Sequence, residues 1–297
     1  MILGLGCLAC DHVLFTDTPW DAGKGRIVRS ETRIGGNARN ALATVAALGY
    51  AAGYVATVGT SAVGEQAMTD LVDHGIDTRF VERIAGADPV TATITVTTGG
   101  DRYIAFDDSS LATTPLPSSE IVDAALALAD VILVDATNAP PGSLLMTERA
   151  RSAGIPVIVD AERDPTPDMR ALMDVADHLV IPLGVGAMIT GHDDPARIAG
   201  GLWSSSRSVI VLTDGSRGAY AFGAPEDMAH VPAYRVDAVD TTGCGDAFHG
   251  AYAWALATGV DLVERVAIAS AAAAVVAGLP SGVPRVATWT DIERVRN

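Results

Sequence analysis

Short apolar runs alternate with helical patterns along most of the chain. Uninterrupted apolar runs are typical of strands buried on both faces of a parallel sheet, and apolar residues spaced three or four apart are typical of helices that cover such a sheet. This alternation predicts an α/β fold, with a mostly parallel central sheet and helices on both faces. The expected strands are 1–10, 54–58, 131–135, 157–160, 178–181, 208–212 and 236–239. The expected helices are 37–48, 65–74, 143–153, 169–176, 244–258 and 262–277.

Two segments have a different pattern. Residues 90–106 alternate between threonines and mainly apolar residues, as half-buried antiparallel strands do, and residues 99–101, Gly-Gly-Asp, predict a turn within them. Residues 13–34 alternate weakly and show no helical face. We therefore expect small lid strands, inserted at about 12–34 and 90–107 into a single domain that spans 1–297.

The most informative stretch is residues 236–256, VDAVDTTGCGDAFHGAYAWAL. Its pattern predicts a strand, a glycine-rich turn and a helix. Gly243 and Gly245 let backbone N–H groups converge where the helix begins, and these donors and the helix dipole attract an anion. Asp246 falls in the first helical turn. There it either caps the helix or takes a proton from a hydroxyl group as a phosphoryl group arrives.

The run D-T-T-G-x-G-D-A-F-x-G resembles the C-terminal signature of the ribokinase-like (PfkB) carbohydrate kinases, with Cys244 where that family usually has alanine. The resemblance extends over nearly the whole chain, and its second specific motif is GGNARN at 35–40. It implies a ribokinase-like fold and an ATP-dependent transfer of a phosphoryl group to a hydroxymethyl group of a sugar. It also implies that Asp246 is the base, while the amides of Gly243, Cys244 and Gly245 stabilise the transferred charge.

The same resemblance implies how the substrates are held. Asp11, which we expect in a loop after the first strand, would orient the sugar with Gly36 and Asn40. The turn 213–218 resembles the family's T-x-G-x-x-G segment. The nucleotide contacts implied by the family are Thr213, Gly215, Ser216, Gly218, Gly243 and Gly245. We place the adenine against the helix 262–277 and the loop 278–284, although simple helix packing explains that helix equally well.

At the positions that the family uses for metal binding, this chain departs from the family pattern. Family members usually have an asparagine and, three residues later, a glutamate that organise Mg²⁺ and the ATP phosphates, but this chain has Leu183 and Gly186 there. Another carboxylate, such as Asp160, would have to contribute instead. The resemblance also implies a place for K⁺ or a related monovalent ion beside Asp240 and Thr242.

Composition narrows the class of protein further. The chain has 297 residues, of which 49% are hydrophobic, so it can bury a substantial core. A net charge of −16 repels nucleic acids and anionic membranes, and no apolar run reaches the roughly 20 residues of a membrane span. We therefore expect a cytoplasmic protein with neither partner. Lys24, the only lysine, precedes glycine, which excludes a P-loop. The three cysteines predict buried thiols, not a disulfide framework.

The substrate stays open at this point. We favour a neutral sugar over a sulfosugar, although the D-x-F-H-G form of the signature resembles sulfofructose kinases, because the end of the lid offers Asp107 and Asp108 where a sulfonate needs cations. A nucleoside is a further alternative and needs an aromatic wall. Candidates for that wall are Phe15, Trp20, Tyr103 and Phe106. Leu183 and Gly186 also leave open a catalytically weakened, sugar-binding regulator.

Two further expectations concern the surface. Arg39, between the motif residues Ala38 and Asn40, is expected to be an exposed helix residue, and Arg217 either supports phosphate charge or is exposed. Strand edges that nothing covers tend to find partners, so we expect a homodimer that forms through the lid strands.

Overall fold

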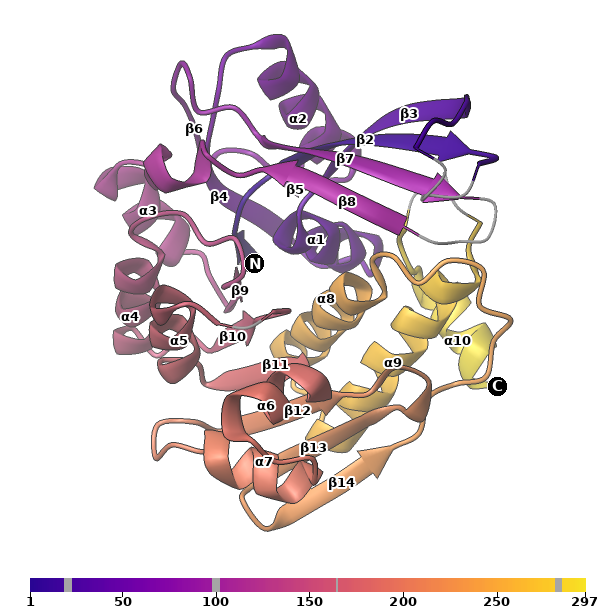
Figure 1. Cartoon of the computed structure of the whole chain (residues 1–297). Coiled ribbons are helices and arrows are strands. Elements are labelled where there is room, and N and C mark those ends of the chain that lie inside the picture. Colours follow the sequence, from indigo (N-terminus) through magenta and orange to yellow (C-terminus); the bar gives the residue numbers. More distant parts are fainter. Residues whose placement is uncertain (19–22, 98–101, 164, 281–284) are drawn as a thin grey trace.

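The computed structural model describes residues 1–18, 23–97, 102–163, 165–280 and 285–297 (Figure 1). Its main sheet has ten strands in the order β14-β13-β12-β11-β10-β9-β1-β4-β5, and β6 pairs with β4. Strands β13 and β14 are antiparallel to their neighbours, and the others are parallel. The strands are β1 (Ile2–Leu5), β4 (Ala52–Val58), β5 (Ile76–Asp77), β6 (Val81–Arg83), β9 (Val131–Asp135), β10 (Val157–Asp160), β11 (His178–Pro182), β12 (Val209–Thr213), β13 (Ala219–Ala224) and β14 (Asp227–Val231).

Helices cover both faces of this sheet, as the sequence pattern predicts (Figure 1). One face carries α1 (Asn37–Ala47), α2 (Ala62–Asp73), α8 (Cys244–Ala257), α9 (Leu262–Gly278) and α10 (Trp289–Arg296). The other carries α3 (Ser119–Leu126), α4 (Ser143–Ser152), α5 (Pro167–Asp174), α6 (Leu183–Thr190) and α7 (Pro195–Leu202). Successive strand residues enter opposite cores: Ile132 packs on the second face, and Leu133 on the first. This explains why the strands are apolar throughout.

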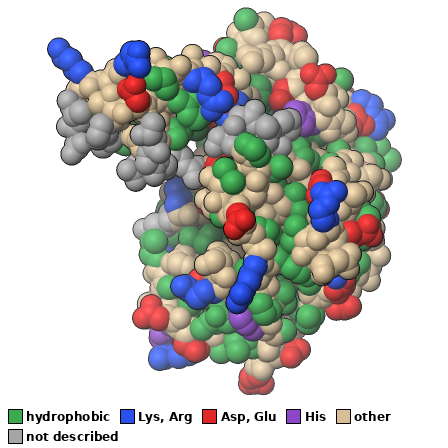
Figure 2. Space-filling view, turned by 90° about the vertical axis from the view of Figure 1, so that its right-hand side faces the viewer, with side chains coloured by type: hydrophobic (Ala, Val, Ile, Leu, Met, Phe, Trp, Pro, Cys, Tyr) green, Lys and Arg blue, Asp and Glu red, His purple; other side chains and the backbone are tan. Residues whose placement is uncertain are grey.

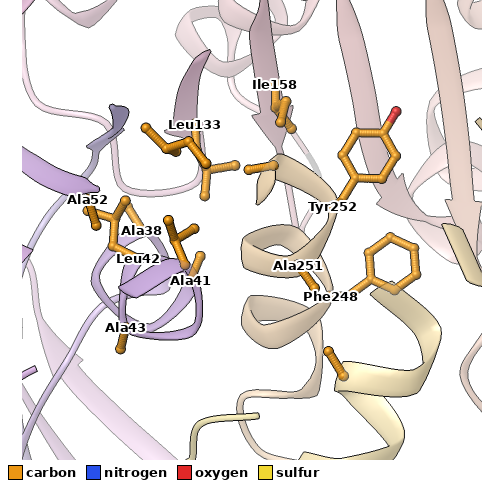
Figure 3. Packing of buried hydrophobic residues seen from close by; sticks show 14 of the residues in the cluster. Ala38, Ala41, Leu42, Ala43, Ala52, Leu133, Ile158, Phe248, Ala251 and Tyr252 are labelled. Atoms are coloured by element: carbon orange, nitrogen blue, oxygen red, sulfur yellow. The ribbon is translucent and has the colours of Figure 1, made fainter. Parts of the chain in front are cut away.

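Helices α1 and α8 come unusually close because small residues line their contact. Ala41 of α1 and Ala251 of α8 face the same core (Figure 3). A Cβ added at Gly250 would lie 2.2 Å from the carbonyl oxygen of Ala41 and 2.9 Å from Cβ of Thr44. Only glycine fits there, so the glycine that ends the D-A-F-x-G run brings two helices together.

The lid strands form one separate four-stranded sheet, which we call the lid sheet. Its order is β3-β2-β7-β8, with β2 parallel to β7 and the outer pairs antiparallel. The strands are β2 (Ala9–Thr16), β3 (Ile27–Gly35), β7 (Val90–Thr97) and β8 (Arg102–Asp107). The apolar run 1–10 is thus two strands, and Asp11 lies within β2. Our expectation that Asp11 lies in a loop is wrong. Pro19, Trp20, the turn 99–101 and the loop residues 281–284 lie outside the described residues.

Other features bear on the expected partners. No helix within the described ranges is long and apolar enough to cross a bilayer. No disulfide joins Cys7, Cys10 and Cys244; Cys10 is buried as expected, whereas Cys7 and Cys244 are only half-buried. On the face in Figure 2, acidic and basic side chains lie side by side over much of the surface.

Candidate active site

The glycine-rich turn and helix form as predicted at residues 243–257, but the strand expected at 236–239 does not form, and those residues are irregular. Gly243, with φ +76°, is the N-cap residue of α8 and adopts a left-handed conformation that favours glycine. The amide of Ala247 donates to the carbonyl oxygen of Gly243 at 2.9 Å. The amides that precede Ala247 have no acceptor within the helix and lie at its entrance. The Cys244 amide makes a long hydrogen bond, 3.3 Å, to the carbonyl of Thr241. Of the three amides we expected to stabilise charge, this one is therefore partly engaged in the turn.

Asp246 lies in the first turn of α8 and is 6% exposed. Its Oδ2 accepts a hydrogen bond of 2.8 Å from Nδ2 of Asn40, which α1 provides. Burial, and then the negative charge of Glu162, raise the pKa of Asp246 well above the usual aspartate range, while the Asn40 hydrogen bond opposes this rise. A carboxylate with a raised pKa is better matched to accept a proton near neutral pH. The structure thus joins two predicted site residues.

Arg39 is buried, so our expectation that it is exposed is wrong. Its guanidinium pairs with Asp70 of α2 and contacts His74, the C-cap residue of the same helix. Its Nη1 also donates to Oδ1 of Asn40 at 3.1 Å. Because the Asn40 amide donates to Asp246 at its other end, Arg39 fixes which way this amide points.

Three further carboxylates lie at the carboxyl ends of β9 and β10: Asp135 and Asp160 end these strands, and Glu162 follows β10. Asp135 is buried and accepts hydrogen bonds from the amides of Thr137 and Asn138, so it caps its own loop. Asp160 is also buried, and its Oδ1 lies 3.5 Å from Nε2 of His249. This Oδ1 atom has no hydrogen-bond partner among the described residues.

Glu162 is the exposed carboxylate at this edge. Its Oε2 accepts a hydrogen bond of 2.9 Å from Asn37, and a Cβ added at Gly245 would lie 3.6 Å from its Oε1. Glu162 therefore lies beside the entrance of α8, on the side of Asn37.

His249 supports α8 from beneath Asp246. Its Nδ1 lies 2.8 Å from the carbonyl oxygen of Gly245, and its Nε2 lies 3.0 Å from that of Val180. Both neighbours are acceptors, so the ring links α8 to β11.

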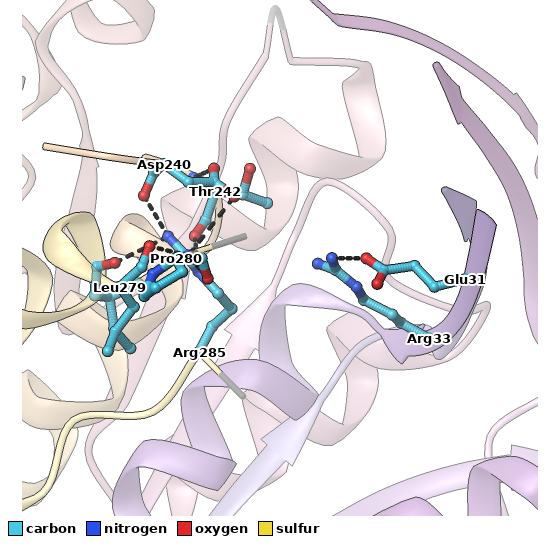
Figure 4. Close-up of polar contacts among 8 residues, drawn as sticks. Glu31, Arg33, Asp240, Thr242, Leu279, Pro280 and Arg285 are labelled. Carbon is cyan, nitrogen blue, oxygen red and sulfur yellow. Dashed lines mark hydrogen bonds and ion pairs between the residues drawn. The ribbon is translucent and has the colours of Figure 1, made fainter. Parts of the chain in front are cut away.

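A cavity of about 220 Å³ lies between the lid sheet and the loop before α8. Its lid side is mostly apolar and includes Phe15 and Ile94, and its other side includes Thr241 and Thr242. Arg33 also lines it and pairs with Glu31, which neutralises its charge (Figure 4).

Asp11 lies beside Arg33 across the β2–β3 register, and burial raises its pKa. A Cβ added at Gly36, whose φ is +116°, would lie 2.3 Å from the carbonyl oxygen of Cys7. Backbone packing alone therefore requires this glycine.

The turn expected to bind nucleotide follows β12. Thr213 ends that strand, and residues 215–217 form a short 3-10 helix that includes Ser216. Gly215 and Gly218 both have positive φ, and a Cβ added at Gly218 would lie 2.1 Å from the carbonyl oxygen of Val231. Arg217 is exposed and pairs with Asp214, so its charge is already balanced.

Leu183 and Gly186, which stand where the family usually has asparagine and glutamate, lie in α6. A Cβ added at Gly186 would lie 2.6 Å from Cγ2 of Ile198 on α7. Leu183 packs against the second core. No group of three or more His, Cys, Asp or Glu side chains within the described ranges is arranged to hold a metal.

Asp240 and Thr242 lie in the loop before α8. The Thr242 amide donates to Oδ1 of Asp240 at 2.9 Å, and the backbone carbonyls of both residues accept hydrogen bonds from Arg285 (Figure 4). Sequence reasoning missed Arg285, Glu162 and the role of Arg39. No sequence motif marks these contacts, because the partners come from distant segments.

The fold is that of the ribokinase-like α/β proteins, with a mostly parallel sheet between helices. Residues 5–285 match the pfkB family of carbohydrate kinases, and the chain belongs to this family. It is 24% identical to ribokinase from Bacillus subtilis over 277 residues, which are 91% of this chain and 90% of that protein. It is 30% identical to ribokinase from Mus musculus over 234 residues, 75% of this chain and 71% of that protein.

A solved structure gives a similar fold. The structure of Arabidopsis thaliana ribokinase complexed with ribose and ATP superimposes with a TM-score of 0.85 at 20% identity, over 99% of this chain and 97% of that one.

Proposed function

We propose that this protein is an ATP-dependent phosphotransferase that phosphorylates a hydroxymethyl group of a sugar or sugar derivative. The observation that carries the proposal is the Asn40–Asp246 hydrogen bond at the amide-lined entrance of α8. It places an oriented carboxylate with a raised pKa where a phosphoryl group meets backbone donors.

Each part of the site then has one role. Asp246 takes the proton of the sugar hydroxyl, and the amides of Gly243, Cys244 and Gly245 stabilise the charge of the transferred group. Asp11, Gly36 and Asn40 orient the sugar beneath the lid sheet. The turn that contains Thr213, Gly215, Ser216 and Gly218 contacts ATP.

Magnesium would be held by the ATP phosphates together with Glu162. When bound, it neutralises the charge that develops on the phosphates.

A neutral sugar remains our first choice of substrate. Arg33, a cation that lines the cavity, is paired with Glu31, so a sulfonate would have to displace that partner. A nucleoside is the second candidate, because Phe15 and the apolar lid residues around it form a wall of the kind that a base packs against. Tyr103 and Phe106 are exposed to water, so they would contribute to this wall only if a second surface covered the lid sheet.

Turnover of ATP across a panel tests the proposal. The panel contains neutral pentoses and hexoses, a sulfosugar and nucleosides, each at saturating concentration with MgATP. We expect product formation with at least one neutral sugar. Thermal stabilisation by a sugar without any turnover would contradict the proposal and favour a sugar-binding regulator.

We also propose that two copies associate through the edges of the lid sheet. The edge strands β3 and β8 expose large apolar side chains, which a partner would cover. These are Ile27, Val28, Tyr103, Ile104 and Phe106, each between 46% and 55% exposed.

A further inference from the structure

Backbone oxygens from two distant segments converge on the side chain of Arg285. Its Nε donates to the carbonyl of Thr242 at 3.0 Å, and Nη2 donates to that of Val276 at 2.9 Å and also to that of Asp240. Its Nη1 donates to the carbonyl of Leu279 at 3.0 Å. Figure 4 shows the guanidinium enclosed between the loop before α8 and the end of α9.

This set of oxygens requires a positive charge. The carbonyls of Val276 and Leu279 lie at the C-terminal end of α9, where the helix dipole is negative. The Asp240 carboxylate, whose side chain is only 12% exposed, lies 3.6 Å from Nη1 of Arg285. Converging carbonyls and a shielded carboxylate repel one another unless a cation lies among them.

Arginine suits this position because it is always charged and presents five N–H donors in one plane. The side chain of Arg285 is 12% exposed, so most of its donors face the oxygens and not water. The same oxygens include the carbonyls of Asp240 and Thr242, beside which the family resemblance implies K⁺. A potassium ion among them would have to lie close to the guanidinium, and two positive charges at such a distance repel each other strongly where little water screens them. The residues present therefore do not fit K⁺.

We propose that the Arg285 guanidinium replaces the monovalent cation, so that the kinase works without K⁺; this inference rests on the proposed function. Arg285 is a positioning residue. Its Cβ lies 3.6 Å from the position that a Cβ on Gly243 would take, and Gly243 is the N-cap of α8. By holding the carbonyls of Asp240 and Thr242, Arg285 fixes the turn that aims the amides at the transferred phosphoryl group.

The test compares wild type, Arg285→Ala and Arg285→Lys in buffers whose only monovalent cation is tetramethylammonium, before and after addition of KCl. Wild-type kcat should not change with KCl. Arg285→Ala should lose at least about tenfold in kcat without KCl, and added KCl should restore activity saturably because K⁺ can enter the vacated site. Arg285→Lys, which keeps the charge, should retain more activity without KCl.

A second readout does not depend on activity. The melting temperature of Arg285→Ala should rise with KCl more than with tetramethylammonium chloride, and that of wild type should rise equally with both. Arg294→Ala is the matched control, because Arg294 is an exposed arginine on α10 that pairs with Asp291. It should behave as wild type in both assays.

Three results would overturn the inference. These are saturable activation of the wild type by K⁺, an Arg285→Ala variant as active as wild type without KCl, or a loss that KCl rescues in neither assay. If no substrate supports turnover by the wild type, the proposed function fails, and the melting temperatures still decide whether Arg285 replaces a cation.

Discussion

Asn40 and Asp246 lie 206 positions apart in the sequence, and the hydrogen bond between their side chains defines the site. Each residue could be selected from its own motif. Their contact could not, because it depends on how closely α1 and α8 pack. The same limit explains Arg39: its partners Asp70 and His74 lie 31 and 35 positions away, on a helix whose position the local pattern does not reveal.

Asp135 provides a test of the electrostatics at the scale of one residue. Burial raises its pKa to about 6, from an unfolded value of roughly 3.9. Because the folded pKa is raised, its contribution to stability is full below about pH 4 and is lost as pH rises through about 6. The side chain of Asp135→Asn stays neutral at all pH values, and its Oδ1 still accepts the loop amides. The difference in the free energy of unfolding between variant and wild type should therefore shift in favour of the variant by about 1–3 kcal/mol from pH 4.5 to pH 7.5.

Urea unfolding at these two pH values measures the difference. Asp17→Asn is the control, because Asp17 is an exposed carboxylate whose pKa is lowered by its hydrogen bond to Arg26. Its difference from wild type should hardly change over this range. A pH-independent difference for Asp135→Asn would show that the buried carboxyl does not titrate as described.

At the scale of elements, the central strands and the helices α1, α8 and α9 could be predicted, because their apolar runs are long and glycines end them. Helices α6 and α7 were missed, since LGVGAMIT and PARIAGGL contain glycines and show little amphipathic pattern. The break between β1 and β2 was missed because Gly6, Cys7 and Leu8 continue the apolar run. Local patterns fail where tertiary contacts determine the structure.

Gly250 tests the close packing of α1 and α8. In Gly250→Ala the new methyl group would overlap the Ala41 carbonyl, so the helices must separate. We expect a loss of about 1–3 kcal/mol in the free energy of unfolding, with a lower kcat because Asn40 moves away from Asp246. Gly200→Ala on α7 is the control, because a Cβ there meets nothing within 4 Å. It should stabilise by about 0.5–1 kcal/mol. Equal effects of the two substitutions would contradict the packing argument.

At the scale of the whole molecule, the lid sheet projects its edge strands away from the main sheet (Figure 1). The apolar side chains exposed there suit association of two copies better than contact with water.

Sedimentation velocity tests the proposed dimer. Wild type should sediment as a dimer, and Val28→Glu on the edge strand β3 should shift it toward monomer, because a charge would be buried at the interface. Leu145→Glu on α4 is the control, since Leu145 is as exposed but lies far along the chain from the lid strands, on the second face of the main sheet. A monomeric wild type, or dissociation by both substitutions, would refute association through the lid edge.

In the proposed reaction, the Asp246 carboxylate accepts the proton of the sugar hydroxyl. Its most direct test is the kcat of Asp246→Asn on the best substrate of the panel, measured with the stabilisation of the variant by that sugar. The amide keeps the shape of the side chain and removes the base, so kcat should fall by about 10²–10⁴-fold while the sugar still raises the melting temperature. Wild-type turnover by Asp246→Asn would contradict the account.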